Sequence, residues 1–240
     1  RILRFLLNSN SVLSTVQNKS DYNYLLNNIK VQLNNLSLIL GSGVDIKTFY
    51  YQEETLEIPR VTMVSRLLWD KGVEVLIESS RLLKAKKVSC NITLVGWSDS
   101  GNKYSAIPNN IIKEWVDEGL IDFWGKSDDV PKVWRESHIC VFPTSYPEGL
   151  PKTLLEAAAS GRPIITTDIP GCLEIVQDQV NGIIIPQDDP EMLTRSIEIL
   201  LKDPLLRKNM GLKGREKVIA NFSDEVIIQQ TMNLYSQLLN

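Results

Sequence analysis

The feature that most constrains the fold is a regular alternation between residues 61 and 185. Short runs rich in β-branched residues recur there, and each is followed by a longer stretch with apolar residues at helical spacing. This alternation is typical of β-α-β units, which build a parallel sheet with helices on both faces. It predicts an α/β fold with a Rossmann-like, doubly wound parallel sheet. The predicted strands are residues 61–65, 92–95, 121–124, 139–142, 164–166 and 182–185.

Helical patterns fill the gaps between these strands and continue to the end of the chain. Residues 73–86 have helical periodicity, as do residues 151–160, whose helix is ended by Gly161. Beyond Asp189 the pattern is helical throughout, with a break at Asp203. We expect these last helices to cover the sheet and not to form a separate domain.

The first 35 residues differ from the rest of the chain. They are rich in asparagine and contain one strand-like run, 11–17, and one predicted helix, 21–29. We therefore predict a remnant of a preceding domain at residues 1–35 and one large domain at residues 36–240, with a charged loop at 52–59. Because the chain begins at Arg1 inside an already patterned segment, we expect it to be the C-terminal part of a longer protein.

Composition and charge exclude several classes of partner. The net charge is −3, so no overall positive field attracts nucleic acid. No segment approaches the roughly 20 consecutive apolar residues that a membrane span needs, so we expect any membrane contact to be peripheral. The three cysteines Cys90, Cys140 and Cys172 are widely spaced, and we interpret them as reduced thiols of a cytoplasmic protein.

The most informative loop follows the fourth predicted strand, because ligands of an open parallel sheet bind beyond the carboxyl ends of its strands. Residues 143–151 lead from that strand into a helix. Pro151 suits the first helical turn, and it leaves the amides from Gly149 to Thr153 free to face a ligand. Such a helix start favours an anion.

Two carboxylates, Glu148 and Glu156, flank this predicted anion site. They would repel a phosphate, so we expect them to accept hydrogen bonds from vicinal hydroxyls, which a sugar nucleotide carries. Spacing alone favours a simpler interpretation, in which both are solvated surface charges. The apolar neighbours Leu154 and Leu155 indicate instead that Glu156 is partly buried, and a buried carboxylate needs partners.

A second loop follows the first predicted strand and brings two cations to the start of a helix. An arginine such as Arg66 can grip phosphate oxygens with two hydrogen bonds, and Lys71 adds a point charge. Together they can bind a diphosphate and stabilise it as a leaving group. Solvated surface charges are the alternative, and the position at a strand end makes the two interpretations about equal.

Taken together, these motifs resemble the C-terminal domain of the retaining glycosyltransferases of family GT4, which have the two-domain GT-B fold. The resemblance covers nearly the whole chain. Its most specific part is the Glu-x7-Glu spacing of Glu148 and Glu156 combined with the Arg66 and Lys71 pair. The other matching segments are Gly43-Val44-Asp45, Ser65-Arg66-Leu67, Lys71-Gly72, Trp124-Gly125, Phe142-Pro143-Thr144 and Asn181-Gly182.

The resemblance implies a role for each residue of the first loop. Glu148 contacts the donor sugar, and the backbone amides of Gly149 and Leu150 bind the sugar or its phosphate. Glu156 binds the hydroxyls of the ribose. Thr153, at the helix start, belongs to the same predicted donor site.

The resemblance also implies how the rest of the donor is held. Arg66 and Lys71 bind the diphosphate, which makes these two residues and Glu148 the predicted catalytic residues. The base lies near Gly125 and Lys126, mainly against their backbone. One departure from the family is the segment 95–100, where a tighter, glycine-rich turn is usual.

The reaction implied is transfer of a hexosyl group, with retention, from a nucleoside diphosphate sugar to a glycan or lipid-linked acceptor. UDP is the expected nucleotide, and neither a metal ion nor another cofactor is expected. The acceptor binds to the missing N-terminal domain, so this chain alone is expected to bind donor better than it catalyses transfer. The complete enzyme is expected in the cytoplasm, with peripheral contact at the inner face of the plasma membrane.

Other classes of protein fit the sequence less well. The segment Gly96-Trp97-Ser98-Asp99-Ser100 comes near a nucleophile elbow but ends in serine. His138 and Cys140 share a strand face, yet two ligands do not make a zinc site. No strand is followed by Gly-x-Gly-x-x-Gly, which argues against a dinucleotide oxidoreductase.

A GT-B nucleotide-sugar epimerase and a non-catalytic nucleotide-sugar-binding module remain open alternatives. Three residues after the fifth strand are interpreted as structural, namely Asp168, Gly171 and Glu174.

Overall fold

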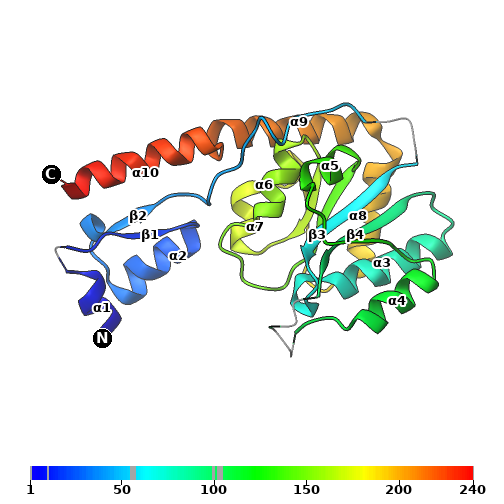
Figure 1. Ribbon diagram of the computed structural model, residues 1–240, viewed down its shortest axis with the longest axis horizontal. Coiled ribbons are helices and arrows are strands. Elements are labelled where there is room, and N and C mark those ends of the chain that lie inside the picture. The colour runs from blue at the N-terminus through cyan, green and yellow to red at the C-terminus, as the bar shows by residue number, and fades with distance from the viewer. Residues whose placement is uncertain (1, 10, 55–57, 99–100, 102–104, 240) are drawn as a thin grey trace.

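The chain folds into two parts of unequal size (Figure 1). The computed structural model describes residues 2–9, 11–54, 58–98, 101 and 105–239. Residues 60–221 form a six-stranded domain, and residues 2–40 form a smaller N-terminal unit beside it. The last helix, α10 (Asp224–Leu239), leaves the six-stranded domain and runs along the N-terminal unit.

All strand pairs of the large sheet are parallel, in the order β5-β4-β3-β6-β7-β8. The chain builds outward from β3 to β4 and β5, then returns to the other side of β3 with β6 and continues to β8. This is the strand order of a doubly wound, Rossmann-like sheet, so the predicted fold class is confirmed. The strands are β3 (Arg60–Arg66), β4 (Asn91–Trp97), β5 (Asp122–Gly125), β6 (Ile139–Phe142), β7 (Ile164–Thr167) and β8 (Gly182–Ile185).

The centre of the sheet is apolar because helices cover both of its faces. Every residue of β6 and β7 is buried. The edge strand β5, by contrast, exposes Asp122, Phe123 and Trp124, and its register with β4 shifts between Leu94 and Val95. The predicted strands at β6 and β8 have the observed bounds, whereas the predicted strand at β5 begins one residue early.

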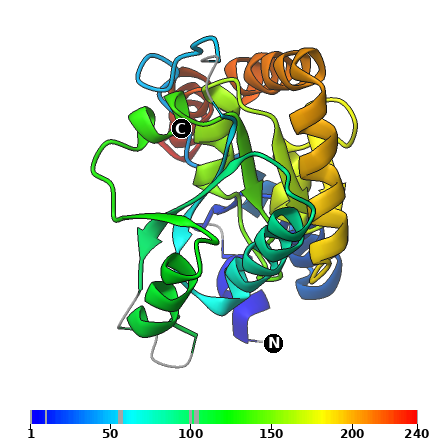
Figure 2. The same cartoon turned by 90° about the vertical axis from the view of Figure 1, so that its right-hand side faces the viewer.

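Helices pack on both faces of the sheet, as right-handed crossovers require. The helix α3 (Val73–Ala85) packs against α8 (Pro190–Lys202) on one face, and α6 (Lys152–Ala159) packs against α9 (Pro204–Asn221) on the other (Figures 1 and 2). The shorter helices of this domain are α4 (Asn109–Asp117), α5 (Val130–Arg135) and α7 (Pro170–Ile175).

The helices α8 and α9 begin where the sequence predicts. Asp189 caps α8 and Asp203 caps α9, because each carboxylate accepts a hydrogen bond from the backbone N–H three residues further on. A proline follows each cap in the first helical turn, where its missing N–H costs nothing. The predicted break at Asp203 is therefore confirmed.

The N-terminal unit contains a second, two-stranded parallel sheet. Its first strand, β1 (Ser14–Val16), lies within the predicted run 11–17. Its second strand, β2 (Leu36–Leu38), was not predicted, and it pairs with β1 across the predicted domain boundary at residue 35. The sheet thus draws on residues from both predicted parts, and the division into domains stays a prediction.

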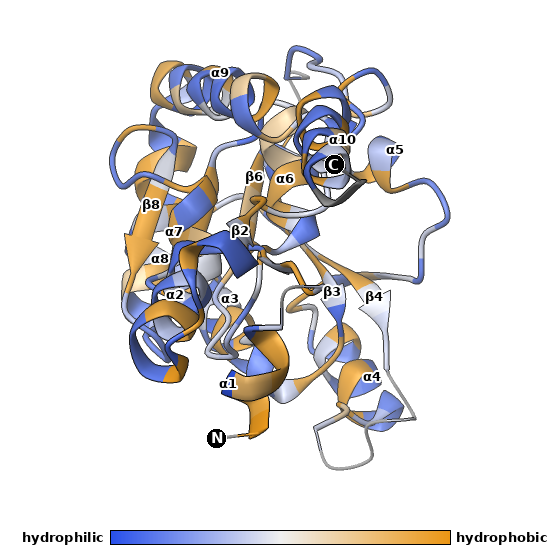
Figure 3. Cartoon of the chain, turned by 90° about the vertical axis from the view of Figure 1, so that its left-hand side faces the viewer, coloured by the Kyte–Doolittle hydropathy of each residue, from blue (hydrophilic) through white to orange (hydrophobic). Residues whose placement is uncertain are grey.

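Helices complete the N-terminal unit. The predicted helix at 21–29 is observed as α2 (Lys19–Tyr24) followed directly by a π-helix (Leu25–Ile29). The helix α1 (Ile2–Leu7) has no buried residue, although most of its side chains are apolar. Figure 3 shows this apolar helix at the surface beside the N-terminus.

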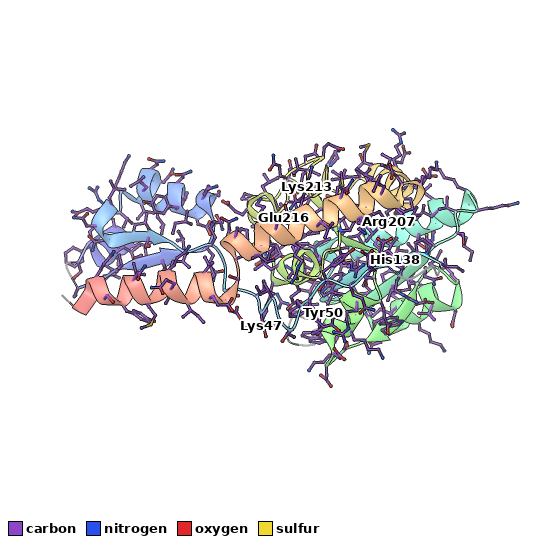
Figure 4. The ribbon with its side chains drawn as sticks, turned by 90° about the horizontal axis from the view of Figure 1, so that it is seen from above. Lys47, Tyr50, His138, Arg207, Lys213 and Glu216 are labelled. Atoms are coloured by element: carbon purple, nitrogen blue, oxygen red, sulfur yellow. The ribbon has the colours of Figure 1, made fainter. Side chains whose placement is uncertain are left out.

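Two chain segments join the N-terminal unit to the six-stranded domain, and they pair with each other. The Val44 N–H donates to the Phe222 carbonyl at 3.0 Å, and the Asp224 N–H donates to the Val44 carbonyl at 3.1 Å. Lys47 lies beside this crossing, with its Nζ 3.8 Å from a carboxylate oxygen of Glu225 on α10 (Figure 4). We refer to this pairing as the crossing.

The predicted loop at 52–59 forms neither helix nor strand where it is described, at residues 52–54 and 58–59. Residues 55–57 lie outside the described part of the chain. Two carboxylates of this loop are held by α9: Glu54 is 2.7 Å from Arg207, labelled in Figure 4, and Glu53 is 2.8 Å from Lys208. No helix within the described ranges is long and apolar enough to cross a membrane.

The cysteines carry free thiols in the structure. Burial raises the pKa of the Cys90 thiol to about 11 and that of Cys172 to about 12. Burial also raises the pKa of Cys140 well above its ordinary value. These thiols are therefore protonated near neutral pH and are poor nucleophiles.

Candidate functional site

Two loops meet where the strand order reverses. Because β3 and β6 are neighbours, the loop at 66–72 and the loop at 143–151 lie at the same edge of the sheet. The Asp70 carbonyl joins them by accepting hydrogen bonds from the Ser145 N–H at 3.1 Å and the Thr144 hydroxyl at 3.2 Å. The fold thus brings together the two loops singled out in the sequence.

Gly72 allows the two loops to approach this closely. Its φ is +78°, and a Cβ at this position would collide with the carbonyl oxygen of Pro143. Only glycine combines this left-handed backbone with such a close contact. Gly72 also ends the short 3₁₀ turn Trp69–Lys71 and begins α3.

Lys71 and Glu148 form a largely buried ion pair between the loops. The Lys71 Nζ lies 2.5 Å from Oε1 of Glu148, and the side chains are 7% and 18% exposed. The same ammonium lies 4.3 Å from the centroid of the Tyr146 ring. Charges this far from water are tolerated only when they are paired, so each of the two side chains keeps the other at this edge of the sheet.

The backbone at Glu148 rests on the first turn of α7. A Cβ on Gly171 would lie 2.5 Å from the carbonyl oxygens of both Glu148 and Gly149. This contact agrees with the structural role expected for Gly171. Asp168, just before α7, accepts a hydrogen bond from Gln187 at 3.0 Å and so has a structural partner too.

The N-terminal unit touches the same loop. The Asn18 side-chain amide donates to the Gly149 carbonyl at 3.1 Å, and the Lys19 N–H donates to Glu174 at 2.9 Å. The Lys19 ammonium also lies 3.3 Å from the second oxygen of Glu174. These contacts were not predicted, because the partners are 131 and 155 residues apart in the chain. The one local signal was the helix cap itself, in which Asn18 accepts from the Asp21 N–H.

The helix α6 starts beside Glu148 with polar groups that lack partners. Pro151 is the N-cap and not a residue of the first helical turn as predicted, because the helix begins one residue later, at Lys152; no side chain caps this helix start. The first N–H groups of a helix have no acceptor within it, so this start favours an anion. The buried hydroxyl of Thr153 has no hydrogen-bond partner among the described residues. Leu150 is anchored by packing against Gly41.

Glu156, on α6, is a carboxylate in apolar surroundings. Burial raises its pKa to about 7, and the charge of Lys152 and the indole of Trp134 offset part of that rise. Trp134 is fully buried, and its Nε1 has no partner within hydrogen-bonding distance in the described part of the chain. Partial burial of Glu156 is confirmed, whereas the contribution of Trp134 was missed, because α5 meets α6 only in the folded chain.

The other predicted residues lie along the same edge of the sheet. Arg66 is exposed at the end of β3. Gly125 ends β5 with a φ of +66°, and the space where a Cβ would stand is open. The Lys126 ammonium lies 5.5 Å from the ring centroid of Trp97, which ends β4. All predicted site residues thus lie at strand ends, in the loop after β3, or in the loop and helix that follow β6.

The residues considered for a zinc site or a nucleophile elbow make structural contacts instead. His138 is 4% exposed, and its Nδ1 accepts a hydrogen bond from the Arg60 N–H at 3.1 Å. The Ser98 hydroxyl donates to the Ile107 carbonyl at 2.8 Å, while Asp99 and Ser100 lie outside the described residues. Within the described ranges, no three His, Cys, Asp or Glu side chains gather closely enough to hold a metal ion.

The chain belongs to the family described as glycosyl transferases group 1, which matches residues 50–217. One relative is the N,N'-diacetylbacillosaminyl-diphospho-undecaprenol alpha-1,3-N-acetylgalactosaminyltransferase of Campylobacter jejuni. It is 28% identical over 99% of this chain and 65% of its own length. The Staphylococcus aureus capsular polysaccharide biosynthesis glycosyltransferase CapM is 27% identical over 73% of this chain and 45% of its own. The chain therefore spans about two thirds or less of these relatives.

Solved structures share the fold. A glycosyltransferase from Rickettsia africae ESF-5 superposes with a TM-score of 0.87 at 22% identity, covering 100% of this chain and 68% of its own. Anabaena HepE, solved in complex with UDP, superposes with a TM-score of 0.85 at 18% identity, covering 99% and 67%. The resemblance to the C-terminal domain of a GT-B glycosyltransferase is confirmed by these matches together with the family.

Proposed function

We propose that this chain is the donor-binding part of a retaining glycosyltransferase. The complete enzyme transfers a hexosyl group from a nucleoside diphosphate sugar, with UDP as the nucleotide, to a glycan or lipid-linked acceptor. The observation that carries the proposal is the pair of Lys71 and Glu148, which puts a cation and a carboxylate 2.5 Å apart at the reversal of strand order. A diphosphate needs the cation, and sugar hydroxyls need the carboxylate.

The diphosphate is bound by Lys71, Arg66 and the start of α6. The buried, unpartnered hydroxyl of Thr153 supports a polar ligand at this helix start. When the bond from the anomeric carbon to the diphosphate oxygen breaks, its electron pair stays on the diphosphate, and these groups offset the growing charge. With two cations in this role, the proposed reaction needs no metal ion.

The donor sugar and the ribose are held by the two carboxylates. Once Lys71 turns toward the diphosphate, Glu148 accepts hydrogen bonds from sugar hydroxyls, and the amides of Gly149 and Leu150 bind the same part of the donor. Glu156 accepts from the ribose diol, for which it must be ionised. Its pKa of about 7 puts this ionisation within the physiological range.

The base lies beside Gly125 and Lys126. The open space at Gly125 supports this position, because a flat ring can approach the backbone there without meeting a side chain. The neighbouring Lys126 adds an exposed cation that can lie over a base.

The acceptor binds largely outside this chain, in the part of the enzyme to which residues 1–35 belong. The Campylobacter jejuni relative, whose name describes transfer to a diphospho-undecaprenol substrate, supports a lipid-linked acceptor. The capsular polysaccharide relative supports a glycan product. The HepE structure, which contains UDP, supports the choice of nucleotide. An enzyme of this kind works in the cytoplasm, in peripheral contact with the membrane.

Calorimetric titration of this chain with UDP-, GDP- and ADP-sugars at low salt tests the proposal. We expect binding of the UDP-sugar, unchanged by EDTA. Arg66→Ala and Glu156→Ala should each weaken it roughly tenfold or more, because a hydrogen bond to a charged group contributes about 1.5 to 3 kcal/mol. Arg195→Ala and Glu198→Ala, on α8, are matched controls that should bind like the parent chain.

Two outcomes would count against this function. Absence of nucleotide binding at low salt would overturn it, and equal affinities in Arg66→Ala, Glu156→Ala and the parent would overturn the assigned site. A third measurement separates transferase from epimerase. The complete enzyme, given donor alone, should leave the sugar unchanged, whereas an epimerase would convert it into another sugar.

A further inference from the structure

The Lys71 ammonium has a second neighbour besides Glu148, the ring of Tyr146. Its Nζ lies 4.3 Å from the ring centroid, well within the range at which a cation is attracted to an aromatic face. Tyr146 is 47% exposed, whereas the Lys71 side chain is 7% exposed. The ring therefore forms the outer wall of the place in which the ammonium sits.

This contact differs from the other cation and aromatic pairs in the described part of the chain. Those pairs are Arg60 with Trp124 at 4.7 Å, Lys126 with Trp97 at 5.5 Å and Arg135 with Tyr50 at 5.4 Å. In each of them the cation is more exposed than Lys71. The attraction between a cation and a ring is stronger away from water, so the Tyr146 contact is the one with the largest expected effect.

Hydrogen bonds between the loops place the backbone of Tyr146 close to Lys71. The Tyr146 N–H donates to the Thr144 hydroxyl at 3.1 Å, and that hydroxyl donates to the Asp70 carbonyl at 3.2 Å. Asp70 directly precedes Lys71, so these hydrogen bonds hold the backbone of Tyr146 beside that of Lys71. Thr144 is itself fully buried, and its carbonyl accepts a hydrogen bond from the Thr167 hydroxyl at 2.5 Å.

The two neighbours of Lys71 have opposite consequences for an anion. The Glu148 carboxylate neutralises the ammonium, and this opposes binding of a second anion. The Tyr146 ring attracts the ammonium without carrying a formal charge, so it holds the cation while leaving its charge available. A diphosphate that displaces Glu148 from Lys71 would then find the ammonium still in place.

We propose that Tyr146 is a positioning residue of the anion subsite. It holds the Lys71 ammonium in place while that ammonium passes from Glu148 to the diphosphate of the donor. This inference rests on the proposed function and deepens it by adding a residue that acts through Lys71. Tyr146 lies inside the loop singled out in the sequence, where nothing marked it as different from its neighbours.

The experiment measures affinities of the chain for UDP, UMP and uridine by calorimetry, with Tyr146→Ala and Tyr146→Phe. Tyr146→Ala should weaken UDP binding roughly three- to tenfold. The affinity for UMP should fall by a smaller factor, and the affinity for uridine, which has no phosphate, should not change. Tyr146→Phe keeps the ring and should bind all three like the parent chain. Tyr24→Ala, on α2, is a matched control with a similarly exposed tyrosine.

Each contrary outcome has a distinct meaning. Equal UDP affinity in Tyr146→Ala and the parent would overturn the inference, and so would a Tyr146→Phe variant as weak as Tyr146→Ala, since the hydroxyl would then be the active group. An equal loss for uridine and UDP would show that the ring contacts the nucleoside instead. If the parent chain binds none of the three probes, the proposed function itself fails, and this role fails with it.

Discussion

The two ends of the segment 148–156 place the same functional group in opposite surroundings. Glu148 lies in a loop and meets a buried ammonium from another strand end. Glu156 lies on an apolar helix, where burial outweighs the charge of Lys152 and the indole of Trp134, and its pKa rises to about 7. One carboxylate is stabilised by a charge of opposite sign, and the other is destabilised by loss of water. The segment therefore has one end that is paired with a counter-charge and one end at which burial opposes the charge.

The largest effect is expected from breaking the pair at the Glu148 end. Glu148→Ala leaves the Lys71 ammonium buried without a counter-charge, and it should lower the free energy of unfolding by about 3 to 5 kcal/mol. Urea unfolding at pH 7.5 measures this. The double variant Lys71→Met with Glu148→Leu removes both charges and should recover most of the loss. A Glu148→Ala variant as stable as the parent would remove the contrast between the two ends.

The next effect concerns pH at the Glu156 end. Its pKa is raised from an ordinary 4.5 to about 7, so the folded chain binds this proton more tightly than the unfolded chain does. The resulting stability is fully present below pH 4.5 and is lost as the pH rises to about 7, by up to about 3 kcal/mol. Glu156→Gln should lack this loss in urea unfolding measured from pH 4.5 to 8. The control Glu191→Gln, at an exposed position, should lose stability with rising pH as the parent chain does.

The same ionisation is expected to affect donor binding in the opposite direction. If Glu156 accepts from the ribose, affinity for a UDP-sugar should rise through pH 7 in the parent chain, and Glu156→Gln should bind weakly at every pH. A parent affinity that does not change between pH 5.5 and 8.5 would contradict an ionised Glu156 in the complex.

A smaller effect on stability is expected from a change in packing at the Glu148 end, and this change should leave the Glu156 end unaffected. Gly171→Ala puts a Cβ against the carbonyls of Glu148 and Gly149, and it should cost about 1 to 3 kcal/mol in urea unfolding. Titration by NMR should then show an unchanged pKa at Glu156. Gly214→Ala is the matched control, because its Cβ would make only ordinary contacts and alanine favours the helix. A shifted pKa at Glu156 in Gly171→Ala would mean that the two ends are coupled.

The smallest effect is expected from Trp134→Phe. The indole lowers the pKa of Glu156, so its replacement should raise that pKa further, by about a few tenths of a pH unit. NMR titration of the Glu156 carboxyl detects such a change. Trp115→Phe replaces another largely buried tryptophan, on α4, and should leave the titration unaltered. A lower pKa in Trp134→Phe would assign the indole a desolvating role instead.

The parts of the fold that the sequence predicted well are those in which burial alone determines the pattern. The strands β6 and β8 are apolar along their length, and their predicted bounds agree with the structure. The strand β5 was misplaced by one residue because it is an exposed edge with a register shift, so its pattern is weaker. The strand β2 was missed because its three residues carry too little periodicity. Its partner strand, β1, also lies 22 residues earlier in the chain.

For the candidate site, the sequence indicated which residues gather but not how they interact. Glu148 and Lys71 were assigned to one site from their positions after predicted strands and from the family resemblance. Their pairing, across 77 residues of chain, depends on the contact between two loops that no local pattern encodes. Trp134 and Asn18 were missed for the same reason. Side chains that act through tertiary contacts leave no periodic signal in the sequence.

The crossing at Val44 has a mechanical consequence. Both covalent paths between the N-terminal unit and the six-stranded domain pass through this point, hydrogen-bonded to each other. A reorientation of one part against the other would turn about this crossing, because backbone hydrogen bonds tie the two connecting segments together there. The contacts of Asn18 with Gly149 and of Lys19 with Glu174 join the two parts away from that point. A rotation about Val44 would therefore have to break both of them before the N-terminal unit could leave the Glu148 loop.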